Sequence, residues 1–466
     1  FISDLNGTFG QEFGDSNPGF LNLKKDGYSF EPSVLSLNEA SMEVVKNSFV
    51  GTKPSIVYVN EASTGRNDGT SWVNAFTNLT DALNEKAPIT EIWVAAGTYY
   101  PGEVRSSSFV LPGGIKVLGG FYGNEKISTD RDYSQNETIL SGDIGVIGDS
   151  SDNSYHVIVA LDDAVLDGFI IQDGNASENF TDSRGVGAGL WAESVSFEIR
   201  NCEFKNHWAY QGGAAIWVSE SNATLTNCSF VANQAGITGK GGAIRSNNSQ
   251  LAVGASNFSH NIGPYGGGAL YAEGGSLNFS SSNFSFNRNS YYNGGGALFL
   301  EEVAGEISNC IFTSNETDAN NYGGAVKLVD SSPSFSNCLF QRNGSLKNSA
   351  GAIYIDNESY PILSNNDFRE NFASSWGGAV YSQSLELNVT GGLFLKNWAQ
   401  YGGAIATNGT NKTIFNGIKA YANEANASDN SQGGFLYLGN GANANSFVNC
   451  IFSRNKSNYR HGVFSA

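Results

Sequence analysis

Residues 266–289 read GGGALYAEGGSLNFSSSNFSFNRN, and this stretch decides the fold. Glycines and an alanine precede an aliphatic residue, Leu270. A phenylalanine, Phe284, comes later, and Asn287 follows three residues after it. The same three positions return about every 27 residues, and a fixed period in this range is typical of stacked repeat architectures.

Three columns result when the repeats are aligned. The aliphatic column contains Leu190, Ile216, Ile244, Leu270, Leu298, Val326, Ile353, Val380, Ile405 and Leu436. The second column contains Phe204, Phe230, Phe258, Phe284, Phe312, Phe340, Phe368, Phe394, Ala420 and Phe452. The third contains Asn233, Asn261, Asn287, Asn315, Asn343, Asn371, Asn397, Asn423 and Asn455. The first two columns predict inward-facing core, and the third predicts turns whose stacked amides bond from coil to coil, with Asn tolerating the left-handed conformation.

Composition separates the possible repeat folds. The chain has 57 Gly and only 15% charged residues, so the paired helices of an ankyrin repeat are not expected. Short alternating runs between Gly and Asn predict brief strands joined by tight turns. We therefore predict an all-β protein, a parallel β-helix of about 14 coils that rise about 4.8 Å each. The predicted divisions are an extended arm over 1–52, irregular first coils over 53–185 and regular coils over 186–466.

All five cysteines lie in one pattern, Asn-Cys-x-Phe, two residues before the phenylalanine column. They are Cys202, Cys228, Cys310, Cys338 and Cys450. Because positions two apart share a face of a strand, these thiols are expected to be buried and unpaired. A Cys202–Cys228 or Cys310–Cys338 disulfide between neighbouring coils remains an alternative.

Charge and hydropathy exclude two classes of partner. The net charge is −18, from 44 acidic and 26 basic residues, which disfavours nucleic acid. No run approaches 18 apolar residues, so membrane insertion through a helix is not expected.

The Gly-Gly-Ala-[Ile/Leu/Val] and Phe-x-x-Asn repeats resemble those of the polymorphic outer membrane proteins of chlamydiae and of other secreted bacterial β-helix proteins. Upstream segments at 56–60, 67–72, 92–101, 140–144, 152–156 and 166–170 extend the resemblance. It implies a right-handed parallel β-helix, secreted or surface-displayed, that serves in adhesion or structure. It brings no catalytic residues and no cofactor.

The N-terminal part carries two further predictions. Residues 71–84 predict an amphipathic capping helix, with Ser71 as N-cap and Trp72, Phe76, Leu79 and Leu83 on one face. Residues 1–52 are rich in phenylalanine. We expect an arm that folds back on its own rod, or that docks on a neighbouring subunit by strand addition.

Two candidate binding sites follow from the pattern. The residue after each inward aliphatic position faces outward and is aromatic in seven coils. These aromatic residues are Trp191, Trp217, Tyr271, Phe299, Tyr354, Tyr381 and Tyr437. They are expected either to pack across strands or to form an exposed stripe for sugar rings or a partner chain. Asp143, Asp149 and Asp152, in one Gly/Ser-rich loop, are a candidate Ca²⁺ site or a solvated loop.

Nineteen Asn-x-Ser/Thr sequons occur in the chain and favour an N-glycosylated extracellular protein. The candidate glycosylation sites are Asn6, Asn78, Asn136, Asn175, Asn222, Asn278, Asn357, Asn388, Asn408 and Asn411. Asn315, Asn343 and Asn455 lie in the turn column, where burial is expected to prevent modification.

No carboxylate cluster at equal coil positions is apparent in the sequence, and four His leave little for acid–base work. The expected function is therefore a non-enzymatic structural subunit of an extracellular fibre, surface coat or flagellar hair, which self-associates through its arm and open ends. A monomeric adhesin or carbohydrate-binding rod that contacts surface glycans is the alternative. A polysaccharide lyase or hydrolase is the third hypothesis.

Overall fold

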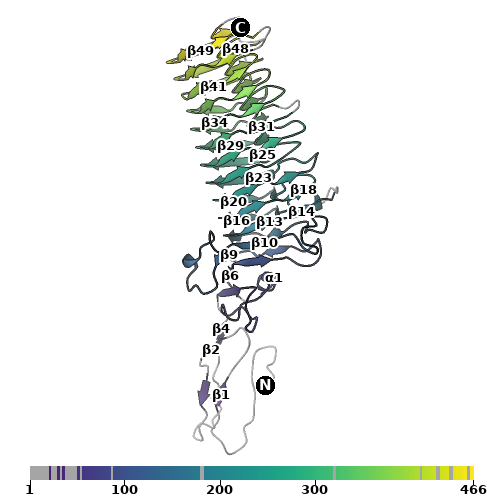
Figure 1. Cartoon of the computed structure of the whole chain (residues 1–466). Helices are drawn as coiled ribbons and strands as arrows, with labels where there is room; N and C mark the ends of the chain where they lie inside the picture. Colours follow the sequence, from purple (N-terminus) through teal and green to yellow (C-terminus); the bar gives the residue numbers. More distant parts are fainter. Residues whose placement is uncertain are drawn as a thin grey trace, which may run out of the picture.

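The rod is built of stacked coils that follow one another in sequence order (Figure 1). The computed structural model describes residues 55–85, 88–178, 183–318, 322–409, 412–426, 431–439, 444–458 and 462–465, and the backbone of four short strands before them. Among the described residues, no helix is long and apolar enough to cross a membrane.

One parallel sheet takes a single strand from each coil and so counts thirteen coils, close to the predicted fourteen. Its strands are β7 (Gly97–Tyr99), β10 (Thr138–Ser141), β13 (Ile170–Gln172), β17 (Glu203–Lys205), β21 (Ser229–Val231), β24 (Asn257–Ser259), β26 (Asn283–Ser285), β30 (Ile311–Thr313), β34 (Leu339–Gln341), β38 (Asp367–Arg369), β42 (Leu393–Leu395), β46 (Lys419–Tyr421) and β50 (Ile451–Ser453).

A second sheet of 25 strands takes two strands from most coils. The first row, which contains the aliphatic column, is β11 (Ile158–Ala160), β15 (Leu190–Glu193), β19 (Ile216–Ser219), β23 (Ile244–Gly254), β25 (Leu270–Ser280), β28 (Leu298–Glu301), β32 (Val326–Val329), β36 (Ile353–Ile355), β40 (Val380–Ser382), β44 (Ile405–Thr407), β48 (Leu436–Leu438) and β52 (Phe464–Ser465). β23 and β25 continue into the second row.

The second row is β12 (Ala164–Asp167), β16 (Ser196–Arg200), β20 (Asn222–Thr226), β29 (Ala304–Ser308), β33 (Ser334–Ser336), β37 (Ile362–Ser364), β41 (Glu386–Thr390), β45 (Lys412–Asn416) and β49 (Ala444–Val448). The first coils add β5 (Ile56–Val59), β6 (Glu91–Ala95), β8 (Phe109–Leu111) and β9 (Lys116–Phe121).

Two narrow sheets close the coils on the remaining side. One holds β14 (Asn175–Ala176), β18 (Trp208–Ala209) and β22 (Gln234–Ala235). The other holds β27 (Arg288–Asn289), β31 (Glu316–Thr317), β35 (Gly344–Ser345), β39 (Phe372–Ala373), β43 (Trp398–Ala399), β47 (Glu424–Ala425) and β51 (Lys456–Ser457). Short 3-10 turns lie at Ser128–Asp130 and Ser183–Gly185.

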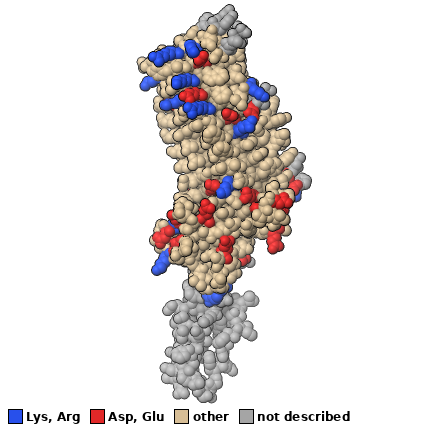
Figure 2. Space-filling model, in the orientation of Figure 1, with Lys and Arg blue, Asp and Glu red and all other residues tan. Residues whose placement is uncertain are grey.

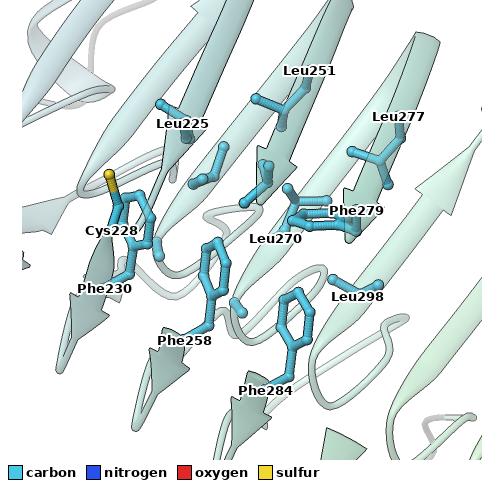
Figure 3. Close-up of a cluster of buried hydrophobic side chains, with 14 of the residues drawn as sticks. Leu225, Cys228, Phe230, Leu251, Phe258, Leu270, Leu277, Phe279, Phe284 and Leu298 are labelled. Atoms are coloured by element: carbon cyan, nitrogen blue, oxygen red, sulfur yellow. The ribbon is translucent and has the colours of Figure 1, made fainter. Parts of the chain in front are cut away.

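The phenylalanine column forms a stacked ladder inside the rod, as predicted. Figure 3 shows the rings of Phe230, Phe258 and Phe284 side by side on successive strands, facing leucines of the second sheet. Neighbouring ring centroids are 4.6 and 4.7 Å apart and the rings are nearly parallel. Each is fully buried, and burial of such a ring stabilises the fold by about 1.5–3 kcal/mol.

The asparagine column forms a second internal ladder, which confirms the predicted amide stacking. Asn261 donates from Nδ2 to the Oδ1 atom of Asn287 at 2.9 Å and to the Phe230 carbonyl at 2.9 Å. The left-handed conformation, however, falls on the preceding residue, such as His260 (φ 56°) or Phe286 (φ 55°). The buried amide needs ordinary backbone geometry to reach inward, so its neighbour makes the turn.

The thiols are free and lie in the core, so the predicted unpaired state is confirmed. Cys202, Cys228, Cys310 and Cys338 are buried and Cys450 is half-buried. Burial raises the pKa of the Cys228 thiol to about 12, which keeps it protonated and unreactive.

The predicted helix over 71–84 is wrong in its extent. Helix α1 spans Leu79–Leu83, and its N-cap is Asn78, whose side chain accepts from the Thr80 amide. Ahead of it, the Phe76 amide donates to the Tyr58 carbonyl at 2.9 Å. This strand-like pairing with β5 satisfies the backbone and competes with helix in residues 71–77.

The described parts of the N-terminal 52 residues pair with one another. β1 (Phe20–Asn22) is antiparallel to β3 (Val34–Ser36), and β2 (Ser29–Glu31) is antiparallel to β4 (Val50–Thr52). The rest of the predicted arm lies outside the described residues, so docking on a neighbour stays a prediction.

Candidate active site

The outward aromatic column is mostly covered, in contrast to the exposed stripe considered from the sequence. Tyr271, Phe299, Tyr354 and Tyr381 are buried, whereas Trp191, Trp217 and Tyr437 are half-buried. Loops that precede the strands fold over this face. The Tyr322 ring lies 4.6 Å from that of Tyr354, and the Trp376 ring lies 5.4 Å from that of Tyr381. The column therefore serves packing in this part of the rod.

Two carboxylates lie on this face on consecutive coils. Glu273 of β25 and Glu301 of β28 are register partners, each two residues after a residue of the outward column. The side chains remain accessible, with exposed fractions of 48% and 34%. Parallel pairing thus places two acids side by side that are 28 residues apart in sequence.

A single phenol joins the two carboxylates. The Oη atom of Tyr271 lies 2.9 Å from Oε2 of Glu273 and 2.5 Å from Oε2 of Glu301. Because both distances end on one atom, the two carboxylate oxygens are at most about 5.4 Å apart, the sum of the two. Carboxyl groups of retaining glycosidases are about 5–5.5 Å apart.

Lys240 completes the cluster. Its ammonium donates to the Tyr271 hydroxyl at 2.5 Å and lies 3.7 Å from Glu273 and 3.9 Å from Glu301. Burial, and then the neighbouring carboxylates, raise the pKa of Tyr271. The phenol therefore stays protonated and can donate its hydrogen to a carboxylate.

Further cations and rings flank the pair along the same face. Burial lowers the pKa of Arg245. Burial also lowers the pKa of Lys327, to about 8, although the negative charge of Glu301 opposes this change. Two and three coils before Tyr271, the rings of Trp217 and Trp191 stack with their centroids 5.6 Å apart. The outward column thus carries a cation on the coil before the pair, Arg245, and on the coil after it, Lys327.

The acidic loop predicted from the sequence is held by its own backbone amides. Asp143 accepts from Gly148, Asp149 from Ser151, and Asp152 from Val146. Within the part of the chain that the structure describes, no three His, Cys, Asp or Glu side chains come together to hold a metal ion. Nδ1 of the nearby His156 lies 3.0 Å from the Gly187 carbonyl oxygen.

The sequons vary in accessibility. Asn78, Asn222, Asn278 and Asn357 are exposed, and Asn136, Asn388 and Asn408 are half-buried. Asn6 and Asn411 lie outside the described residues. Asn175 is buried and its amide nitrogen donates to the Ser150 carbonyl, so the atom that would carry a glycan is engaged. Burial of Asn315, Asn343 and Asn455 is confirmed.

Residues 168–340 and 242–418 match the family model described as right handed beta helix region, and together they cover more than half of the chain. The chain belongs to the right-handed β-helix family. This confirms the handedness that the resemblance implied, whereas the polymorphic outer membrane protein type of repeat stays a prediction. No curated protein matches this β-helix protein by sequence.

Several solved structures are similar to this β-helix protein. One is the catalytic domain of a family 87 α-1,3-glucanase in complex with nigerose, with 12% identity and a TM-score of 0.34 over 88% of this chain and 70% of that chain. Another is a family 28 exopolygalacturonase from Yersinia enterocolitica, with 12% identity and a TM-score of 0.30 over 90% and 80%. At these values no activity or substrate is transferred to this chain.

The matched structures are glycoside hydrolases, which is contrary to the prediction of a non-enzymatic fibre, coat or hair subunit. The claim that equal coil positions hold no carboxylate pair is also wrong, since Glu273 and Glu301 are register partners. Two acids on neighbouring coils are 28 residues apart in the sequence, so a search within one short segment does not pair them. An alignment of the outward positions three residues after the aliphatic column would have found them.

Proposed function

We propose that this β-helix protein is a glycoside hydrolase that cleaves a polysaccharide at Glu273 and Glu301. The observation that carries the proposal is the meeting of both carboxylates on the Tyr271 hydroxyl, at most about 5.4 Å apart. This upper bound is below the separation of about 6.5–9.5 Å in inverting glycosidases, so we propose a double displacement with retention at the anomeric carbon.

We propose a role for each acid from its contacts and exposure. Glu301 has the shorter bond to Tyr271, and as the nucleophile it attacks the anomeric carbon. Glu273 is the more exposed, and in its acid form it gives a proton to the glycosidic oxygen as the C–O bond breaks. A glycosyl ester on Glu301 results. Water then attacks its anomeric carbon, Glu273 takes the proton from that water, and Glu301 is released as a carboxylate.

Tyr271 and Lys240 are positioning residues in this scheme. The phenol donates to the nucleophile and the ammonium donates to the phenol, so the three groups hold one geometry. The positive charge of Lys240 lies near both Glu273 and Glu301 and reduces the repulsion between their carboxylates.

The test is the release of reducing ends from neutral and acidic polysaccharides, with α-1,3-glucan and polygalacturonate included. Glu273→Gln and Glu301→Gln should each lower kcat at least about 100-fold. Glu302→Gln is the matched control. Glu302 follows Glu301 directly in the sequence, is exposed and lies at a turn, with a φ of 57°. Absence of cleavage across the panel, or wild-type rates in Glu301→Gln, would contradict the proposal.

We also propose an extracellular, N-glycosylated protein with repeats of the polymorphic outer membrane protein type. The exposed sequons at Asn222, Asn278 and Asn357 support this. Endoglycosidase treatment of the native protein should increase its gel mobility, and site mapping should find Asn175 unmodified. A native chain with no glycan would contradict the proposal.

A further inference from the structure

A cleft of about 520 Å³ lies away from the glutamate pair, beside the thirteen-stranded sheet. Its walls come from the loop after β10 and from the turns after β13 and β17. Asp143, Asn153, Asp173, Asn175 and Trp208 line it. The cleft belongs to the N-terminal half of the rod, and in Figure 2 acidic side chains predominate over that half of the visible face.

Two acids share this cleft. Asp143 accepts from the Gly148 amide with both oxygens at 3.0 Å. Burial, and then the negative charge of Asp143, raise the pKa of Asp173. Lys205 opposes that shift, but the ion pair it forms is with Glu203, at 3.2 Å. Two carboxylates thus lie near each other in the cleft, and their repulsion favours a bound cation.

Two asparagines line the same cleft, and the amide oxygen of each is buried without a hydrogen-bond partner among the described residues. Asn153 donates from Nδ2 to the Asp173 carbonyl at 2.6 Å, and Asn175 donates from Nδ2 to the Ser150 carbonyl at 2.5 Å. These bonds orient the amides, and both Oδ1 atoms are left with no hydrogen-bond partner among the described residues. The two residues are only 5% and 9% exposed. A buried acceptor without a partner destabilises the fold unless something binds it.

We propose that the cleft binds a Ca²⁺ ion through the carboxylates of Asp143 and Asp173 and the side-chain carbonyls of Asn153 and Asn175. The donor set is entirely oxygen, with two charged and two neutral ligands, and water fills the remaining positions. Ca²⁺ suits this irregular set better than Mg²⁺, which requires near-octahedral geometry and keeps most of its water. A neutral sugar could bond the amide oxygens but would leave the carboxylate repulsion in place.

The proposed ion has a structural consequence. It would tie the loop over 142–156 to the next coil, since Asp143 and Asn153 come from the loop, Asp173 from the turn after β13 and Asn175 from β14. We expect Ca²⁺ to raise the melting temperature of the full chain. The inference is independent of the proposed hydrolase, because the two sites share no residue.

The experiment uses Tb³⁺, whose luminescence Trp208 should sensitise from the wall of the cleft. Tb³⁺ should luminesce with the wild-type chain, and Ca²⁺ should suppress the signal at much lower concentration than Mg²⁺. Asp143→Asn with Asp173→Asn should lose the signal and the rise in melting temperature. Trp208→Phe should lose the signal but keep the rise.

Asp149→Asn is the matched control, because this acid lies in the same loop but not in the lining of the cleft, and it should behave as wild type. Circular dichroism establishes that each variant is folded. Wild-type behaviour of the double variant would overturn the proposal. So would an unchanged melting temperature with Ca²⁺, or a rise that only an oligosaccharide produces. Glu273→Gln should keep the Ca²⁺ response, so failure of one proposal is distinguishable from failure of the other.

Discussion

At the scale of single residues, His207 shows how burial fixes a protonation state. Nδ1 accepts from the Gly174 amide at 3.0 Å, so the proton lies on Nε2, which donates to the Ile171 carbonyl at 3.1 Å. Burial lowers the pKa of the imidazole to about 3. A second proton would remove the acceptor of the Gly174 amide as well as place a charge in the core.

This residue should make the rod less stable in acid. Between about pH 6.5 and pH 3 the unfolded chain binds a proton on His207 that the folded chain does not, so stability falls as pH falls. The slope from this group approaches about 1.4 kcal/mol per pH unit. Urea midpoints between pH 7 and pH 4 should therefore fall less in His207→Gln than in the wild type. Parallel curves for the two proteins would contradict the assignment.

Tyr271 carries a prediction about the glutamate pair at the same scale. Tyr271→Phe should keep the fold but lower kcat by about 10-fold to 100-fold, because a positioning hydrogen bond to Glu301 is lost. Tyr354→Phe is the control, as its hydroxyl bonds Gln383 at 2.6 Å. Equal effects of both variants would point to packing alone.

At the scale of elements, the glycines before each first-row strand permit the close approach of neighbouring coils. A Cβ atom on Gly296 would lie 1.9 Å from the Gly324 carbonyl oxygen, and this backbone atom cannot move aside. On Gly254 it would meet only the Ser280 hydroxyl, at 3.5 Å. The Gly-Gly-Ala pattern is therefore a packing requirement between strands.

Gly296→Ala should consequently lower the free energy of unfolding by at least about 2 kcal/mol, whereas Gly254→Ala should leave it nearly unchanged. Thermal midpoints of the two purified variants measure the difference. A neutral Gly296→Ala variant would mean that the coils can separate locally and that the glycine pattern has another origin.

At the scale of the whole molecule, one coil is a removable unit. Arg342 and Glu370 occupy the same turn position one coil apart, with φ values of 54° and 56°. Deletion of 342–369 joins equivalent positions and should shorten the rod by about 4.8 Å without loss of fold. X-ray scattering measures the length. Cleavage should survive, because Glu273 and Glu301 lie on earlier coils.

The matched deletion, 274–301, also removes one coil but takes Glu301 with it. It should fold equally well and be inactive. If both shortened rods unfold, coils are not interchangeable units. If both remain active, the glutamate pair is not the catalytic site.

Much of the fold could be predicted because inward residues repeat locally. Leu270, Phe284 and Asn287 recur with one period, and each occupies the interior as expected. The helix over 71–84 could not be predicted, because pairing of Phe76 with Tyr58 opposes its local periodicity. The burial of most of the outward aromatic column could not be predicted either, because the rings that cover it, such as Tyr322, come from separate loops.

The amino-acid sequence by itself determined the β-helix, its coil length, its buried thiols and its two internal ladders, because a repeat must bury the same positions in every coil. Tertiary structure alone decided the candidate sites. Glu273 and Glu301 meet through strand register across 28 residues, and the cleft draws Asp143 and Asp173 from different segments. Contacts between side chains on separate coils leave no local periodicity, so they become visible only once the coils are stacked.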